Sequence, residues 1–335
     1  MERPYPSYTL MSADLAPEKR EELLRVLLRD HTTGQNIFWA TDSYSHLGNG
    51  YHCDAPITPD AIETGVIKPR EEKPRELQQQ RSREMAEVFT PSWICNKQNN
   101  LIDNAWFGRE NVFNSEIDPT DGSHTWIPTE RKIEFPEGKT WRDYVTEPRL
   151  EITCGEAPYL VSRYDAATGT PIPVEMRVGL LDRKLRVVGE NTRKSGEWLA
   201  AAKAALRSVY GFEWQGDNLV IARANILSTV IDHYRAKFSR NIPPQSLPGM
   251  AYIISWNIWQ MDGLKGVIPD SCGERLTVVA DLFGETVTVS QCQGCKDGDI
   301  RGHNGTYAMI VDWPNDVTSS QVKHKEPTRF IDLIK

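Results

Sequence analysis

The sequence predicts an α/β fold in which a parallel sheet carries helices on both faces. Three strand patterns, Leu150–Thr153, Ser208–Glu213 and Met250–Ile258, alternate with helical patterns at Glu197–Arg207 and Asp217–Phe238. Such alternation is typical of βαβ units, whose crossover helices pack back onto the sheet. With 335 residues and 39% hydrophobic content, the chain is long enough to bury a large core around this sheet.

The residues before this alternation predict an extension of helices and irregular segments over residues 1–85. Residues 16–29 have the apolar periodicity of an amphipathic helix, and Pro17 suits its first turn. Residues 74–85 predict a solvated helix, since their charges alternate in sign. Residues 36–59 mix aromatics with glycine and proline and predict loops and short strands of no assignable role.

The second predicted domain is residues 86–335. It begins with a helical pattern over residues 92–106, and residues 118–139 then predict an irregular insert because proline and glycine recur in them. The strand and helix alternation follows. We therefore expect the sheet, and any ligand site at its edge, to lie in this domain.

Composition limits the functional class. The formal net charge of −7 argues against bulk electrostatic coating of nucleic acid, although it allows a local groove. No run approaches the roughly 18 apolar residues of a membrane span, and the amino terminus lacks a secretory apolar stretch, so we expect a cytoplasmic protein without membrane association. Six cysteines are too few for a disulfide scaffold of this length, so we expect no disulfides.

Two acids follow strands at positions suited to a nucleotide-like ligand. Glu151 and Gly155 lie in a strand and the turn after it, where glycine lets the backbone approach a ligand. Glu213 ends the next strand, where a carboxylate can accept hydrogen bonds from both hydroxyls of a ribose. The alternatives are an ordinary glycine turn and an exposed glutamate at a strand end.

Two further segments complete an ordered set of motifs. Phe89-Thr90-Pro91 precedes the first strand, and Asp262-Gly263-Leu264 follows the third strand pattern. Together with Tyr210-Gly211-Phe212-Glu213 and the helix after it, this set resembles the S-adenosylmethionine-dependent methyltransferases that act on amino groups in DNA within restriction-modification systems. The resemblance covers Glu87 to Leu264. Its first motif departs from the family pattern, because Glu156-Ala157 replaces the usual small residues after the glycine.

The resemblance implies a methyltransferase-type, Rossmann-like parallel sheet, either abbreviated or completed by a partner, and assigns roles to the matched residues. Phe89, Thr90 and Pro91 would pack against the methionine part of the cofactor. Glu151 and Gly155 would lie near its amino acid end, Glu213 would bind the ribose, and Asp262 would bind the adenine amino group. The implied cofactor is S-adenosylmethionine, and the implied substrate is an amino group in DNA, with adenine preferred.

The catalytic tetrapeptide of that family has no standard counterpart here. It combines Asn or Asp with two prolines and an aromatic residue, which supply a hydrogen-bond acceptor and a stacking face for a base turned out of the helix. Asp312-Trp313-Pro314-Asn315 keeps an acid, an aromatic and one proline, and Asn257-Ile258-Trp259-Gln260 keeps an amide and an aromatic. We prefer Asp312 and Trp313 as catalytic candidates because they follow the adenine-binding element. The alternative is that these aromatics belong to the core.

A metal site is predicted within residues 270–306. Cys292 and Cys295 form a C-x-x-C pair, with Cys272 before them and His303 after them. Three thiolates and an imidazole suit tetrahedral zinc, and the intervening glycines permit tight turns. We expect a structural zinc knuckle inserted between the third and fourth strands. Unmetallated cysteines in a hairpin are the alternative.

Three classes of function stay open from the sequence. The first is methylation of DNA, with a restriction or specificity subunit as partner. The second is a noncatalytic cofactor- or DNA-binding subunit that acts with a partner, which the altered tetrapeptide favours. The third is a methyltransferase for RNA or protein, which the acidic net charge leaves open.

Overall fold

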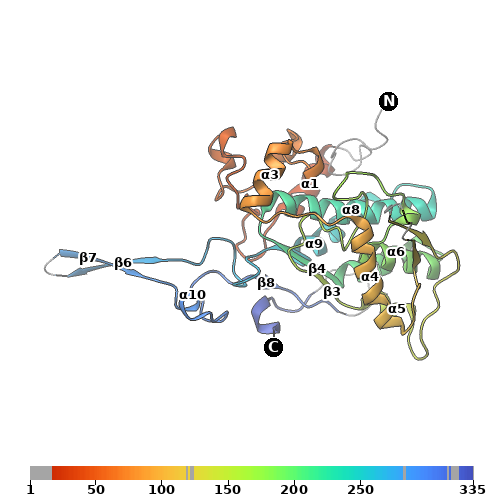
Figure 1. Cartoon of the computed structure of the whole chain (residues 1–335). Coiled ribbons are helices and arrows are strands. Elements are labelled where there is room, and N and C mark those ends of the chain that lie inside the picture. Colours follow the sequence, from red (N-terminus) through yellow and green to blue (C-terminus); the bar gives the residue numbers. More distant parts are fainter. Residues whose placement is uncertain are drawn as a thin grey trace.

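Three short strands form a parallel sheet in the order β3-β4-β5 in the computed structural model (Figure 1). The structure describes residues 17–117, 120, 124–281, 284–314, 317 and 324–334. The strands are β3 (Arg149–Glu151), β4 (Val209–Glu213) and β5 (Ile258–Gln260), and both pairings are parallel. All three strands therefore end at one edge. Among the described residues β3 pairs only with β4, so its other side is open.

Helices connect these strands as the sequence alternation predicts. Between β3 and β4 lie α6 (Leu180–Asn191) and α7 (Ser195–Arg207). Between β4 and β5 lie α8 (Gly216–Phe238) and α9 (Leu247–Asn257). The protein is thus a mixed α/β structure built on a small parallel sheet.

The prediction of a strand over Met250–Ile258 is wrong. These residues form most of α9, and only Ile258 belongs to β5. The helix packs against α1, α7 and α8, so nearly all its sides are buried and its sequence has no polar face. A short, continuously apolar run cannot be assigned to a strand or a helix by periodicity, and here packing from several sides decides.

The amino-terminal segments pack into the same core as the sheet. The helices are α1 (Pro17–Leu28), α2 (Pro59–Glu63), α3 (Arg75–Glu84), α4 (Ser92–Phe107) and α5 (Trp141–Thr146). This confirms the predicted helices over residues 16–29, 74–85 and 92–106. Residues 1–16 lie outside the described residues. One buried cluster joins leucines of α1 to residues of α6 to α9.

The expected irregular segment over residues 118–139 contains part of a hairpin. Strand β1 (Asn114–Ile117) pairs antiparallel with β2 (Thr125–Pro128). Residues 118–119 and 121–123 lie outside the described residues. Six 3₁₀ turns are described: Ser45–Leu47, Asn49–Tyr51, Arg70–Glu72, Val174–Met176, Pro244–Ser246 and Phe330–Leu333.

The predicted insert after β5 is a two-stranded arm with a short helix. Within the described part of the chain, strands β6 (Arg275–Asp281) and β7 (Gly284–Ser290) pair only with each other, and the hairpin projects from the body (Figure 1). Residues 282–283 lie outside the described residues. Helix α10 (Gln293–Asp297) follows, and a bridge between Val267 and Tyr307 closes the insert at its base. Strands β8 (Met309–Ile310) and β9 (Thr328–Arg329) then form a small antiparallel pair.

Within the described part of the chain, we find no helix with the length and apolar character needed to cross a bilayer.

Candidate functional site

A crevice of about 970 Å³ opens at the carboxyl ends of β3 and β4. Open α/β sheets bind ligands at this place, because the loops there diverge and leave space above the strand ends. The walls come from segments far apart in the sequence. The main ones are residues 40–43, 83–90, 151–155 and 213–215.

Glu151 lies at the end of β3 and holds the loop that follows. Its two carboxylate oxygens accept hydrogen bonds from the backbone N–H groups of Tyr159 (3.2 Å) and Leu160 (3.1 Å). Burial raises the pKa of Glu151 to about 8; the two backbone hydrogen bonds oppose this rise, and the charge of Glu213 adds to it. The crevice therefore contains a carboxyl group that can carry a proton near neutral pH.

Glu213, Gly155 and Phe89 meet in the crevice. One carboxylate oxygen of Glu213 accepts a hydrogen bond from the N–H of Gly155 (2.8 Å), and the other accepts from the N–H of Gln215 (3.1 Å). Burial raises the pKa of Glu213. Gly155 has φ of +53°, and a Cβ there would lie 3.4 Å from Cε1 of Phe89. The positive φ of this turn therefore favours glycine, while a methyl group there would make ordinary contact with the Phe89 ring.

Backbone strain is concentrated around this crevice. Ala40, Ala86, Thr153 and Asp270 have φ between +50° and +57°, and all four line the crevice. Non-glycine residues avoid this region because Cβ crowds the carbonyl oxygen, and each instance costs on the order of 1 to 3 kcal/mol. Strain of this kind persists where surrounding contacts enforce it, and it is common at ligand-binding sites.

A buried ion network fixes the wall formed by residues 83–90. Asp217, at the start of α8, accepts hydrogen bonds from Lys73 (2.9 Å), Arg81 (3.0 Å) and Tyr44 (2.8 Å). Arg81 also pairs with Glu87, which lines the crevice. Burial by itself would raise the pKa of Asp217, but the charges of Arg81 and Lys73 outweigh it and hold this pKa well below its usual range.

The predicted cofactor residues separate into two groups. Phe89, Thr90, Glu151, Gly155 and Glu213 line the crevice. Pro91 precedes the first residue of α4 outside the lining. Asp262 lies in the turn after β5, where its carboxylate accepts hydrogen bonds from the N–H groups of Leu264 (2.9 Å) and Lys265 (3.2 Å). Asp262 therefore lies in this turn, outside the lining of the crevice.

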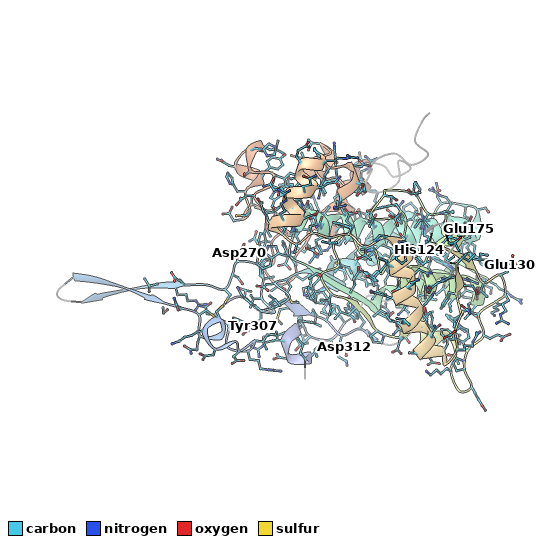
Figure 2. All side chains as sticks on the ribbon, viewed as in Figure 1. His124, Glu130, Glu175, Asp270, Tyr307 and Asp312 are labelled. Carbon is cyan, nitrogen blue, oxygen red and sulfur yellow. The ribbon has the colours of Figure 1, made fainter. Side chains whose placement is uncertain are left out.

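The two catalytic candidates lie outside the crevice. Trp313 is only 6% exposed, packs in the core, and donates its indole N–H to Oδ1 of Asn257 (2.7 Å). Asp312 is exposed beside the carboxyl-terminal segment and pairs with Lys325 (Figure 2). The buried ring of Trp313 has no open face for a base, whereas Asp312 is exposed, and the catalytic roles of both residues stay predictions. The other candidate segment, residues 257–260, is equally buried.

Sequence reasoning missed the amino-terminal wall of the crevice. Residues 40–43 reach it because β5 and the residues after β4 hold the chain there. Gln260 exchanges two hydrogen bonds with the backbone of Phe38 (3.1 and 2.8 Å), and the indole N–H of Trp214 donates to the carbonyl of Ala40 (3.1 Å). Because these are contacts between residues more than 170 positions apart, no local pattern could have revealed them.

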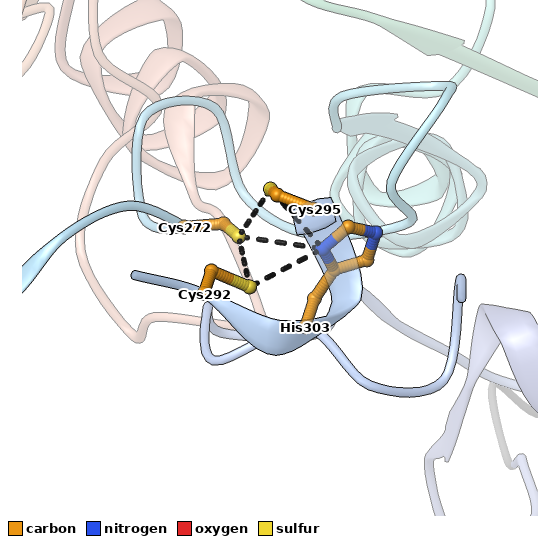
Figure 3. Close-up of side chains that lie close together, drawn as sticks. All are labelled: Cys272, Cys292, Cys295 and His303. Carbon is orange, nitrogen blue, oxygen red and sulfur yellow. Dashed lines mark hydrogen bonds between the residues drawn. The ribbon is translucent and has the colours of Figure 1, made fainter. Parts of the chain in front are cut away.

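A second candidate site is the predicted cluster of Cys272, Cys292, Cys295 and His303 (Figure 3). Their ligand atoms all lie within 4.8 Å of one another. Nδ1 of His303 is 3.4 Å from Sγ of Cys272 and 3.6 Å from Sγ of each of the other two cysteines. This confirms that the predicted residues come together, in an arrangement that can hold a metal ion.

Neighbouring groups stabilise the shape of this cluster. The N–H of Asn304 points at Sγ of Cys292 (3.3 Å), while the amide side chain of Asn304 exchanges two hydrogen bonds with the backbone of Gly273. A Cβ on Gly294 would lie 2.5 Å from the backbone of His303, so only glycine fits there. Such outer contacts orient the groups that bind a metal.

Comparison with known proteins gives no match, whether against protein-family profiles, curated proteins or solved structures.

Proposed function

We propose that the chain binds S-adenosylmethionine in the crevice and takes part in methyl transfer to an amino group of a base in DNA, with adenine preferred. The observation that carries this proposal is the convergence of Phe89, Gly155 and Glu213. These residues come from three separate motifs of the resemblance: Gly155 donates to Glu213, and a Cβ on Gly155 would lie 3.4 Å from the ring of Phe89.

The sheet supports a methyltransferase-type, Rossmann-like fold for this chain. Strands β3, β4 and β5 follow one another in sequence and in space, as in one half of a doubly wound sheet. In that arrangement the first strand, here β3, lies next to the point where strand order reverses. The crevice lies at the carboxyl ends of β3 and β4.

Each of the five predicted cofactor residues that line the crevice has a proposed role. The carboxylate oxygens of Glu213 each accept one backbone hydrogen bond and keep further lone pairs for the two ribose hydroxyls. Gly155 lets the backbone approach the cofactor, and Glu151 holds the loop near its amino acid end. Phe89 and Thr90 pack against the methionine part. Asp262 lies outside the lining of the crevice, so the proposal does not rest on it.

Calorimetric titration with S-adenosylmethionine tests the cofactor site. Glu213→Ala is expected to weaken binding by about 1 to 3 kcal/mol, since it removes the hydrogen bonds to the ribose. Glu63→Ala, an exposed glutamate at the end of α2, serves as the matched control and should bind normally. Equal affinities of wild type and Glu213→Ala would remove Glu213 from the site, and a folded wild type that binds no cofactor would reject the proposal.

A second candidate function is a cofactor-binding subunit whose partner completes the catalytic site. Two observations favour it. The catalytic candidates lie away from the crevice, and β3 is an edge strand among the described residues, with Leu150 in it and Ile152 directly after it 44% and 68% exposed. A restriction or specificity subunit could continue the sheet from β3. Transfer of a labelled methyl group to unmethylated DNA by the isolated chain would exclude this candidate.

We further propose that the metal of the Cys/His cluster is structural zinc. A tetrahedral zinc with Zn–S of about 2.3 Å and Zn–N of about 2.0 Å has S···N edges of about 3.5 Å. The S···N distances from His303 are 3.4, 3.6 and 3.6 Å. Cys272 and Cys292 flank the β6–β7 hairpin, so the ion would join the two ends of an arm that pairs with no other strand among the described residues.

Elemental analysis of the purified chain tests the zinc site. We expect one zinc per chain, lost in Cys292→Ser and retained in the control Cys53→Ser, whose thiol lies outside the cluster. Zinc retained in Cys292→Ser, or absent from the wild type, would contradict the assignment.

A further inference from the structure

The base of the projecting arm connects the Cys/His cluster to the crevice. Asp270 lines the crevice, and Cys272, two residues later, belongs to the cluster. Figure 2 shows Asp270 near the place where the hairpin leaves the body of the molecule. The two sites described above are therefore joined by a very short piece of chain.

Hydrogen bonds and close packing hold this connection. The N–H of Ile268 donates to the carbonyl of Thr306 (2.8 Å), and the N–H of Thr306 donates to Oγ of Ser271 (3.0 Å). The hydroxyl of Ser271 in turn donates to the carbonyl of Ile268 (2.7 Å). A Cβ on Gly305 would lie only 2.9 Å from Cβ of Cys272, so glycine lets the two segments approach. The chain before Cys272 is thus fixed against the loop that follows the last residue of the cluster.

The backbone of Asp270 is strained. Its φ is +57°, which costs a non-glycine residue on the order of 1 to 3 kcal/mol, and such a conformation persists only where its surroundings enforce it. A metal in the cluster would supply one such constraint, because it would tie Cys272 to Cys292, Cys295 and His303 across the base of the arm. We therefore expect the position of the Asp270 carboxylate to depend on the metal.

The crevice that Asp270 lines is acidic. Its lining contains six acidic side chains and one basic side chain, Arg83, among the described residues. Glu87 pairs with the buried Arg81, and the raised pKa of Glu151, about 8, lets that carboxyl carry a proton near neutral pH. Asp270 is exposed and has no ion pair within the described part of the chain. Its carboxylate therefore adds an uncompensated negative charge to the crevice.

A second exposed carboxylate of the lining, Asp42, acts on the same thiol as Asp270. Burial raises the pKa of the Cys53 thiol, which also lines the crevice, and the charges of Asp42, Asp54 and Asp270 raise it further. The N–H of Cys53 donates to Oδ1 of Asp42 (3.2 Å). The amino-terminal wall and the base of the arm thus both bring negative charge to one part of the crevice, which favours a ligand with a positive charge there.

We propose that Asp270 is a ligand-binding residue of the crevice, that its carboxylate faces the positively charged part of S-adenosylmethionine, and that the metal bound by Cys272 holds it there. S-adenosylmethionine carries a sulfonium and an ammonium group, which an acidic wall stabilises. The inference rests on the proposed cofactor site, and it adds a residue from the insert, which the resemblance over Glu87 to Leu264 does not cover. Metal and cofactor would then bind cooperatively, because each favours the same position of one loop.

Calorimetric titration with S-adenosylmethionine tests this in a four-way comparison: wild type and Asp270→Asn, each with zinc and after removal of zinc by a chelator. Asparagine tolerates positive φ, so the variant removes the charge and keeps the backbone. With zinc bound, Asp270→Asn should bind about threefold to fivefold more weakly than the wild type. Removal of zinc should weaken binding to the wild type by a similar factor and should have little further effect on Asp270→Asn.

Glu274→Gln is the matched control. Glu274 also lies two residues from Cys272 and is exposed, but it is outside the lining of the crevice, so the variant should bind like the wild type. Elemental analysis establishes the zinc content of each sample, and circular dichroism establishes its folding. The comparison of the two zinc-loaded proteins needs no metal removal, so it decides on Asp270 even where the chelated chain unfolds.

The outcomes separate this inference from the proposed function. Equal affinities of zinc-loaded wild type and Asp270→Asn would overturn the contact, and an undiminished further loss on removal of zinc from a folded Asp270→Asn variant would overturn the link to the metal. In both cases the wild type binds the cofactor and the proposed site stands. A folded, zinc-loaded wild type that binds no S-adenosylmethionine would reject the cofactor site, and this inference with it.

Discussion

Asp217→Asn is the substitution that tests most directly how the crevice wall is held. Asp217 is fully buried and accepts hydrogen bonds from Lys73, Arg81 and Tyr44. The variant removes the negative charge. Among the described residues the buried Lys73 ammonium has no other ion pair, and Arg81 keeps one ion pair, with Glu87. Breaking a buried pair from one side costs about 3 to 5 kcal/mol.

Urea unfolding followed by circular dichroism measures this loss. The control is Glu21→Gln on α1, whose pair with Arg25 is well exposed and should contribute less than about 0.5 kcal/mol. Adding Lys73→Met to Asp217→Asn should recover part of the stability, because it removes the uncompensated ammonium. A loss below about 1 kcal/mol in Asp217→Asn would refute the reasoning, as would a double variant less stable than the single one.

Three further predictions concern the crevice and the core. The pKa of Glu151 is raised from 4.5 to about 8 by burial, so its contribution to stability is fully present below the lower value and is lost as pH rises through the higher one. Melting temperatures across this range should therefore fall less steeply in Glu151→Gln than in the wild type; parallel curves would contradict the assignment. Gly155→Ala and Gly65→Ala both place alanine at positive φ, so both should lower the melting temperature. Only Gly155→Ala should weaken S-adenosylmethionine binding in calorimetry, because Gly155 lines the crevice, whereas a Cβ on Gly65 has nothing within 4 Å. Trp313→Phe leaves Oδ1 of Asn257 without its indole donor and should cost about 1 to 3 kcal/mol in urea unfolding; wild-type stability in this variant would contradict the core assignment of the ring.

Local patterns predicted much of the architecture because the signals were short-range. The amphipathic periodicity of residues 16–29 and the strand-helix alternation after residue 150 correspond to α1, β3, α7, β4 and α8. The Cys/His cluster was also predictable, since Cys292 and Cys295 lie on one short helical turn and its cap, and glycines let the chain fold back to His303.

The failures have a common physical cause. The apolar run at Met250–Ile258 became a helix because packing from several sides, rather than a polar-apolar alternation, determined its state. Trp313 and Asp262 matched a family order in sequence. In the structure Trp313 packs in the core and donates to Asn257, and the carboxylate of Asp262 accepts a hydrogen bond within its own turn. Order along the chain does not determine which side chains share a cavity.

The sequence by itself determined β3, β4 and most helices of the α/β core, the metal-binding set, and the three motifs that converge near Gly155. Only the tertiary structure decided that residues 250–257 form a helix, that residues 40–43 line the crevice, and that Asp217 anchors its wall. The physical reason is the range of the interactions. Periodicity and turn chemistry act over a few residues, whereas burial, ion pairing and cavity shape depend on segments that meet only in the folded chain.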